Sequence, residues 1–106
     1  MSSDGGLIEA DQFIGSKALL SGPAGGVVGL MRTTNLCDKL GKRGVIGLDM
    51  GGTSTDVCVY YNEVEIKDES KIDGIIVNSP CFDIETVAAG GGSLLYIENG
   101  LMKVGP

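Results

Sequence analysis

The sequence predicts an α/β fold in which a mixed sheet with antiparallel hairpins packs against one main helix. Two observations lead to this prediction. Apolar residues recur at three- and four-residue spacing between Ser21 and Leu40, which is the period of one helix face. After Gly44 the chain changes to short runs rich in β-branched and aromatic residues, separated by glycine-rich or Asn-Gly turns. With 106 residues, the chain has the length of about one small domain.

The main helix is expected to begin at Ser21 and to run to about Leu40. Ser21 is a good N-cap residue, and Pro23 then lies in the first turn, where its missing N–H costs nothing. Basic residues around Gly41 are typical of a helix C-terminus and its cap. Before this helix, the polar stretch at residues 8–17 has room for a short helix.

Strands are expected on both sides of a glycine-rich loop and in the second half of the chain. Residues 45–49 and 56–61 are joined by so few residues that they should form an antiparallel hairpin. Further extended segments are expected at residues 63–67, 75–77, 83–86, 94–97 and 101–104. The last two flank Asn99-Gly100, a strong hairpin signal.

The composition excludes several kinds of site. The chain has no histidine, so a Ser-His-Asp or Cys-His nucleophile pair, an imidazole-bound metal and a histidine general base are all excluded. It carries 14 acidic and 8 basic side chains without a basic cluster. Nucleic acids and anionic lipids are bound through concentrated positive charge, so neither is an expected partner.

Export and membrane insertion are not expected either. The start of the sequence has no signal-peptide pattern, and no apolar stretch approaches the roughly 20 residues that cross a bilayer. Three cysteines, Cys37, Cys58 and Cys81, match neither a metal knuckle nor a paired disulfide framework. They are expected to be small, half-buried apolar residues in a reducing, cytoplasmic setting.

The sharpest chemical signal is the glycine-rich loop between the strands of the first hairpin. A phosphate needs converging N–H donors without side chains in the way, and Gly51 and Gly52 provide both. Thr53, Ser54 and Thr55 add hydroxyl donors, which we expect at the same rim. From the residues alone, two interpretations stay open: a phosphate-binding loop, or a hairpin turn with polar side chains.

Two carboxylates flank this loop. Asp49 ends the first strand and is placed to hold Mg²⁺ through water or to orient an attacking oxygen, because hard cations prefer carboxylate and water oxygens. Asp56 opens the second strand and is expected to fix the loop by accepting backbone or hydroxyl hydrogen bonds.

The segment from Ser21 to Gly26 also has two interpretations. As a helix N-terminus with free N–H groups, it is a candidate anion site. Alternatively, it starts the helix and lets Gly25, Gly26 and Gly29 pack closely against the sheet. It is not a P-loop, because no Lys-Ser or Lys-Thr follows the glycines.

The chain resembles the hydantoinase A and 5-oxoprolinase family, within the superfamily of actin, heat-shock chaperone and sugar-kinase ATPases. Four blocks carry the resemblance in order: Ser3–Leu7, Leu20–Gly29, Leu48–Val57 and Ala89–Ser93. The resemblance implies that the chain is a single partial domain over residues 1–106, part of an actin-like, ribonuclease H-like ATPase domain.

The activity that this resemblance implies is ATP-dependent ring opening. In 5-oxoprolinases ATP activates the lactam carbonyl, and water then opens the ring to give glutamate; relatives act on hydantoins or carboxylate ketones. By resemblance, Gly51, Gly52 and Thr53 cradle the terminal phosphates, with Ser54 and Thr55 lining the loop. Asp49 then acts near Mg²⁺ or the transferred phosphoryl group. The segment with Gly90, Gly91 and Gly92 forms a further close-approach loop.

The chain also departs from the family pattern. Family members are several times longer and bind the nucleotide between two lobes, each with its own phosphate loop, whereas this chain has one D-x-G-G-T segment. The expected partners are therefore ATP, a cyclic amide such as 5-oxoproline or a hydantoin, and a missing lobe or partner subunit. Two other functions stay open: a non-catalytic, truncated binding or assembly module of the same fold, and an ATP-dependent ketone carboxylase relative.

Overall fold

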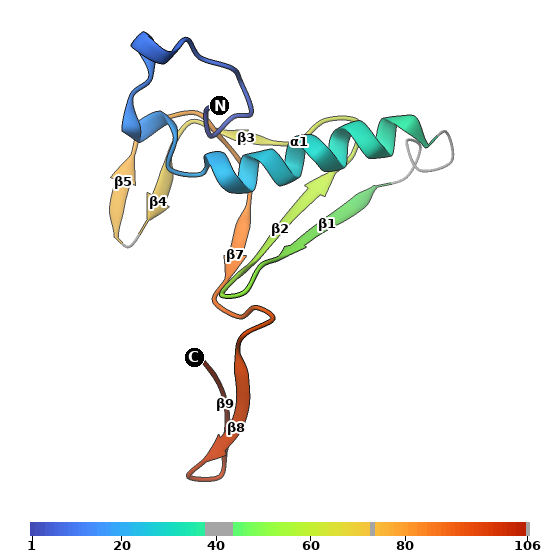
Figure 1. Cartoon of the computed structure of the whole chain (residues 1–106), viewed down its shortest axis with the longest axis vertical. Helices are drawn as coiled ribbons and strands as arrows, with labels where there is room; N and C mark the ends of the chain where they lie inside the picture. The colour runs from blue at the N-terminus through green and yellow to red at the C-terminus, as the bar shows by residue number, and fades with distance from the viewer. Residues whose placement is uncertain (38–43, 73, 106) are drawn as a thin grey trace.

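The computed structural model describes residues 1–37, 44–72 and 74–105. In these residues it contains one α-helix and antiparallel strand pairs, as Figure 1 shows. In chain order the elements are η1 (Ala10–Gln12), η2 (Gly15–Lys17), α1 (Ser21–Leu36), β1 (Val45–Met50), β2 (Thr55–Tyr60), β3 (Ile66–Lys67), β4 (Ser70–Ile72), β5 (Ile75–Val77), β6 (Cys81–Phe82), β7 (Glu85–Val87), β8 (Leu94–Glu98) and β9 (Leu101–Gly105). The α/β class with antiparallel hairpins and one main helix is confirmed. The predicted mixed sheet is wrong for the described residues: every strand pair there is antiparallel, and the strands form one three-stranded and three two-stranded sheets.

The main helix starts where expected but is capped differently. α1 begins at Ser21, and Pro23 lies in its first turn. The N-cap residue is Leu20, and no side chain caps the helix, so the predicted role of Ser21 is wrong. Instead, the Ser3 hydroxyl accepts a hydrogen bond from the Leu20 N–H at 3.1 Å. This contact comes from a residue far away in the sequence, which is why local capping rules did not reveal it.

The helix also ends earlier than the apolar stripe suggested. Its last residue is Leu36, and Cys37 is extended with φ −104° and ψ 93°. The Cys37 N–H donates to the carbonyl of Thr34 at 3.0 Å, which closes the last turn. The expected end at Leu40 and the expected cap at Gly41 lie outside the described residues.

α1 packs on one face of a three-stranded sheet with the order β1-β2-β7. β1 and β2 pair from Val45 opposite Tyr60 to Met50 opposite Thr55, which confirms the predicted hairpin. β7 pairs with the start of β2, with Thr55 opposite Val87, so the second half of the extended segment expected at residues 83–86 lies in a sheet strand that continues to Val87. The buried apolar core lies between α1, β2 and the following segments and consists of Ala24, Val27, Cys58, Tyr60, Val64 and Phe82.

The short strand pairs correct part of the prediction. Within residues 63–67 only β3 is a strand, and it pairs with β6. Alternation predicts Val64 and Ile66 on one face, but Val64 is 7% exposed and Ile66 is 53% exposed, because only Val64 reaches the core. The predicted strand at 75–77 is confirmed as β5, which pairs with β4.

The second predicted hairpin, formed by β8 and β9, is confirmed. Its turn residues Asn99 and Gly100 have φ values of 52° and 77°. Positive φ at both central positions is the requirement of a type I′ turn, and asparagine and glycine tolerate it best. In Figure 1 this hairpin extends away from α1 and the three-stranded sheet.

Much apolar surface is uncovered in this chain. The radius of gyration is 16.1 Å, compared with about 13 Å for a compact domain of this length. A Cβ on Gly47 would meet Leu30 of α1, so the neighbours Ile46 and Leu48 point to the other sheet face, where they are 67% and 71% exposed. Apolar faces of this kind are typical of surfaces that pack against other protein segments.

The three cysteines differ in their burial. Cys58 and Cys81 are buried, Cys37 is exposed, and all three are free thiols, so the expectation of partial burial is wrong for Cys37. Burial raises the pKa of the Cys58 thiol, which keeps it protonated at neutral pH. In the residues that the structure describes, no helix is long and apolar enough to cross a membrane.

The N-terminal turn depends on the carboxylate of Asp4. The Ser2 hydroxyl and, at 3.0 Å, the Gly6 N–H donate to Oδ1 of Asp4. These hydrogen bonds, that of Ser2 first, lower the pKa of Asp4 below its usual 3.8. A lowered folded-state pKa stabilises the fold above the unfolded-state value, and this stabilisation is lost as the pH falls through the folded-state value.

We therefore expect the Asp4→Asn variant to unfold more easily than the parent chain at pH 5, and we expect the difference to shrink as the pH falls. The difference at pH 5 should be at most about 1 kcal/mol, because a partly exposed charge is screened by water. Urea unfolding followed by circular dichroism at several pH values measures it. A difference between the two chains that stays constant from pH 5 to pH 2 would contradict this account.

Candidate functional site: a glycine loop between two strands

The loop at residues 51–54 connects β1 to β2 and closes on itself. The Gly51 N–H donates to the carbonyl of Ser54 at 2.9 Å. Gly51, Gly52 and Thr53 are exposed. Within the described parts of the chain, the N–H groups of Gly52, Thr53 and Ser54 have no protein acceptor. Three neighbouring amides on one exposed turn are thus available to an anion.

The second glycine loop, residues 90–92, lies directly against the first. The N–H groups of Gly91 and Gly92 donate to the carbonyls of Gly51 and Gly52 at 2.9 and 2.8 Å. The Gly90 N–H donates to the Ser93 hydroxyl at 3.0 Å. The amides of this loop are therefore occupied within the chain, and its close approach is to the backbone of the 51–54 loop.

Thr55 is placed differently from Thr53 and Ser54. It is 7% exposed, and its hydroxyl donates to the carbonyl of Ala89 at 2.7 Å. This hydroxyl therefore ties the start of β2 to the 90–92 loop and does not lie at the exposed rim, where the sequence placed it. The pairing of residues 34 positions apart has no local signal in the sequence.

Asp49 lies at the end of β1, just before the loop, and is exposed. Its carboxylate faces α1 at a glycine: a Cβ added to Gly26 would lie 2.8 Å from Oδ2 of Asp49. Across the hairpin, Asp49 is directly opposite Asp56. Like charges at such a pair repel each other, so a bound cation would relieve the repulsion.

The residues present fit Mg²⁺ bound mainly through water and phosphate. Among the described residues, no three His, Cys, Asp or Glu side chains are grouped so that they could hold a metal ion. Mg²⁺ in nucleotide sites commonly takes one or two carboxylates and fills its remaining positions with water and phosphate oxygens. Asp49 and Asp56 supply such a pair. One oxygen of Asp56 also accepts the Thr86 hydroxyl at 2.7 Å. This bond joins β2 to β7 instead of fixing the loop, the role expected from the sequence.

The glycines near the start of α1 have three different surroundings. Gly26 packs against Asp49, as expected for close packing on the sheet, whereas Gly25 faces Met1 and Gly29 faces open space. At the helix start, the Ser21 N–H donates to the carbonyl of Ala18 at 3.0 Å. With this amide occupied and a proline two residues later, the helix N-terminus offers little to an anion.

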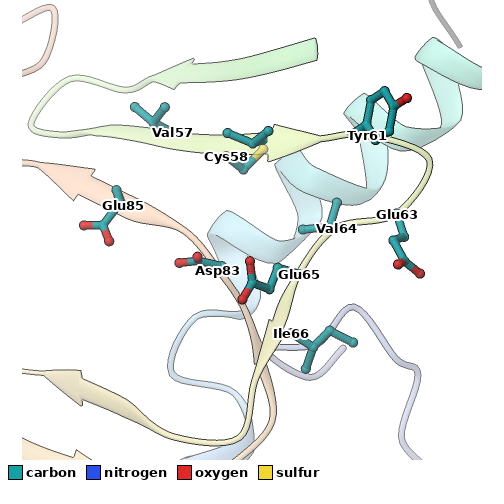
Figure 2. A pocket seen from close by; sticks show the side chains of 10 residues that line it. Val57, Cys58, Tyr61, Glu63, Val64, Glu65, Ile66, Asp83 and Glu85 are labelled. Atoms are coloured by element: carbon teal, nitrogen blue, oxygen red, sulfur yellow. The ribbon is translucent and has the colours of Figure 1, made fainter. Parts of the chain in front are cut away.

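A separate hollow of about 870 Å³ lies between the second half of β2 and the segments 63–66 and 83–85, as Figure 2 shows. Four carboxylates line it, those of Glu63, Glu65, Asp83 and Glu85. Lys67 forms an ion pair with Asp83 at 2.5 Å. This ion pair leaves the negative charges of the three glutamates uncompensated. Negative potential of this kind repels a polyphosphate, so the 51–54 loop is the better candidate for a nucleotide site.

Comparison with known proteins identifies the family of this chain. The model of the hydantoinase/oxoprolinase family matches residues 1–106. The chain belongs to this family. It is 52% identical over 107 residues to 5-oxoprolinase of Saccharomyces cerevisiae, which covers all of this chain and 8% of that protein. With 5-oxoprolinase of Dictyostelium discoideum it shares 46% identity over 116 residues, 9% of that protein.

A solved relative shares the fold. The nucleotide-free structure of acetone carboxylase, from work on ATP-dependent acetone carboxylation, superposes with a TM-score of 0.79 at 30% identity, covering 100% of this chain and 15% of that one. The chain thus spans less than a tenth of the 5-oxoprolinases it matches. Its family resemblance, which rested on four separate blocks, is confirmed.

In the structure, the four family blocks form one continuous unit. The first block contacts the helix start through the Ser3 hydroxyl. The helix block contacts the strand–loop block where Gly26 faces Asp49. The strand–loop block contacts the last one through the backbone bonds of Gly51 and Gly52 to the 90–92 loop.

Proposed function

We propose that this chain forms one phosphate-binding wall of an ATP-dependent hydrolase that opens 5-oxoproline or a hydantoin-type cyclic amide. The observation that carries the proposal is the exposed 51–54 loop, which has three amides without an acceptor among the described residues and follows Asp49 closely in the chain. Membership of the hydantoinase/oxoprolinase family supports the choice of reaction. Because the chain spans about 8% of the yeast relative, the activity is proposed for a whole protein.

In this proposal the loop and its carboxylates hold the terminal phosphates. The N–H groups of Gly52, Thr53 and Ser54 point donors at phosphate oxygens, and Gly51 leaves room for their approach. Bound Mg²⁺ supplies the positive charge that offsets the charge on the phosphoryl oxygens. Asp49 holds the cation or its water, and Asp56 supports it from the opposite strand. Thr55 and Gly90 to Gly92 lie on the side of the 51–54 loop away from the phosphates.

The proposed arrangement is that of an actin-like ATPase domain, with the nucleotide between two lobes. One wall alone gives little of the rate advantage of positioned reactants. The other wall comes from the rest of the polypeptide or from a partner subunit, which also covers the exposed apolar faces. The three free thiols favour the cytoplasm as its compartment.

A related reaction, ATP-dependent carboxylation of a ketone, is the second candidate. The observation that favours it is the structural match to acetone carboxylase at a TM-score of 0.79. The same phosphate wall serves both reactions, because each one uses ATP to activate a carbonyl or carboxylate oxygen. The third candidate is a module that keeps the fold without binding a nucleotide.

Transplanting the chain into two hosts tests the proposal. In one chimaera it replaces the 107 matching residues of yeast 5-oxoprolinase, and in the other the 109 matching residues of the Xanthobacter autotrophicus acetone carboxylase beta subunit, 30% identical to it. ATP hydrolysis and product formation are measured with 5-oxoproline or with acetone. We expect 5-oxoproline-dependent ATP hydrolysis and glutamate formation in the yeast host.

The remaining outcomes separate the candidates. Restored turnover only in the acetone carboxylase host favours the ketone reaction. No turnover in either host, together with no Mg·ATP binding by the isolated chain in calorimetry, identifies a non-catalytic module. The isolated chain itself is expected to show weak or no ATP turnover, and robust turnover by it would contradict the one-wall proposal.

A further inference from the structure

We propose that the 90–92 loop is a positioning element that aims the amides of the 51–54 loop and does not itself contact phosphate. This inference rests on the proposed function only for the identity of the anion. Its structural basis is the pair of hydrogen bonds from Gly91 and Gly92 to the carbonyls of Gly51 and Gly52.

Holding these carbonyls determines the direction of two donors. In a planar trans peptide, the C=O of one residue and the N–H of the next point in opposite directions. The carbonyl of Gly51 points to the 90–92 loop, so the N–H of Gly52 points away from it. In the same way, the carbonyl of Gly52 points to the 90–92 loop, so the N–H of Thr53 points away from it. Both donors therefore point to the side of the loop that the 90–92 segment does not occupy.

The same bonds also strengthen these donors. A carbonyl that accepts a hydrogen bond polarises its peptide unit, which makes the N–H of that unit a better donor. The effect applies to the Gly51–Gly52 and Gly52–Thr53 peptides, since both carbonyls are engaged. A turn without such backing would lack both the fixed direction and the added polarity.

The contact is so close that it needs glycine at particular positions. A Cβ on Gly90 would lie 2.7 Å from the Gly51 carbonyl oxygen, the Gly52 carbonyl carbon and the Thr53 nitrogen. These are backbone atoms, so no flexible side chain can give way. A Cβ on Gly92 would lie 2.9 Å from the Gly52 oxygen, but one on Gly91 would lie at an ordinary 3.7 Å from the Gly51 oxygen. The 90–92 loop therefore tolerates alanine far better at 91 than at 90.

The experiment compares Gly90→Ala with Gly91→Ala. In the isolated chain, amide exchange followed by NMR should be faster at positions 91 and 92 in the Gly90→Ala variant than in the Gly91→Ala variant. Titration with Mg·ATP, followed at the Gly52 and Thr53 amides, should give a dissociation constant raised about tenfold more by Gly90→Ala. Equal effects of the two variants on exchange and affinity would overturn the proposal.

A second pair of variants covers the case in which Gly90→Ala does not fold. Thr55→Val removes the hydroxyl bond to Ala89 without adding atoms, and Thr55→Ser keeps the hydroxyl. In the yeast chimaera, Thr55→Val should raise the KM for ATP and leave the KM for 5-oxoproline unchanged, and Thr55→Ser should restore the parent value. An equal change in both KM values indicates general loosening and overturns the positioning role.

These measurements also separate this inference from the proposed function. If the parent chain does not bind Mg·ATP, the phosphate role of the 51–54 loop is wrong, whereas amide exchange still decides whether the 90–92 loop holds it. If the parent chain binds Mg·ATP and Gly90→Ala loosens the loop without weakening binding, the proposed function stands and the aiming of donors is wrong.

Discussion

Replacing Asp49 by alanine is expected to lower ATP hydrolysis by the yeast chimaera about 10²- to 10³-fold, the usual effect of removing one charge-stabilising group. Asp49 is the second-last residue of β1 and forms, with Asp56 opposite it, the carboxylate pair proposed to hold Mg²⁺. The comparison of kcat for Asp49→Ala with that of the parent chimaera measures this loss.

Stability provides the control for this variant. Because Asp49 is exposed and faces Asp56 across the hairpin, its removal relieves repulsion and should leave the melting temperature of the isolated chain unchanged or slightly raised. Asp11→Ala is the matched control: it also removes one negative charge, at an exposed position in η1, and should leave the ATP hydrolysis of the chimaera unchanged. Full activity of the Asp49→Ala variant would contradict the proposal that the 51–54 loop binds phosphate.

Replacing Gly26 by alanine is expected to lower ATP hydrolysis about tenfold and to leave the fold intact. Alanine is the better helix former by roughly 0.5–1 kcal/mol. Its Cβ, however, would lie 2.8 Å from Oδ2 of Asp49, and the carboxylate has to move away. Activity assays and urea unfolding of the same variant measure the two opposite effects.

Gly29→Ala is the matched control for this variant. Gly29 lies on the same helix, with open space where its Cβ would be, so the substitution should raise the free energy of unfolding without changing activity. If Gly26→Ala is as active as Gly29→Ala, the position of the Asp49 carboxylate does not matter for turnover, and its proposed contact with the cation is wrong.

Elements defined by neighbouring residues could be predicted from the sequence. The β1–β2 hairpin and the turn at Asn99-Gly100 follow from short β-branched runs separated by residues that tolerate tight turns. The start of α1 at Ser21 follows in the same way from the change to a helical period. The family blocks were also recognisable, because each one is a short continuous string.

Features that depend on partners far away in the sequence could not be predicted. Ser21 has the chemistry of a cap, but Ser3 receives the Leu20 N–H. The strand expected at residues 63–67 is short, because Val64 turns into the core and only Ile66 and Lys67 find a sheet partner. Local propensity cannot reveal which partner a backbone group obtains after the chain has folded.

At the candidate site, a reader of the sequence can list the residues that are chemically suited to bind phosphate: small glycines, hydroxyls and a nearby carboxylate. Which of these groups are free for a ligand depends on contacts that form only in the folded chain. Thr55 and Gly90 to Gly92 are engaged within the chain, whereas the amides of Gly52 and Thr53 stay exposed. The physical reason is that a hydrogen-bonding group used inside the fold is lost to a ligand, and such pairing forms between segments distant in sequence.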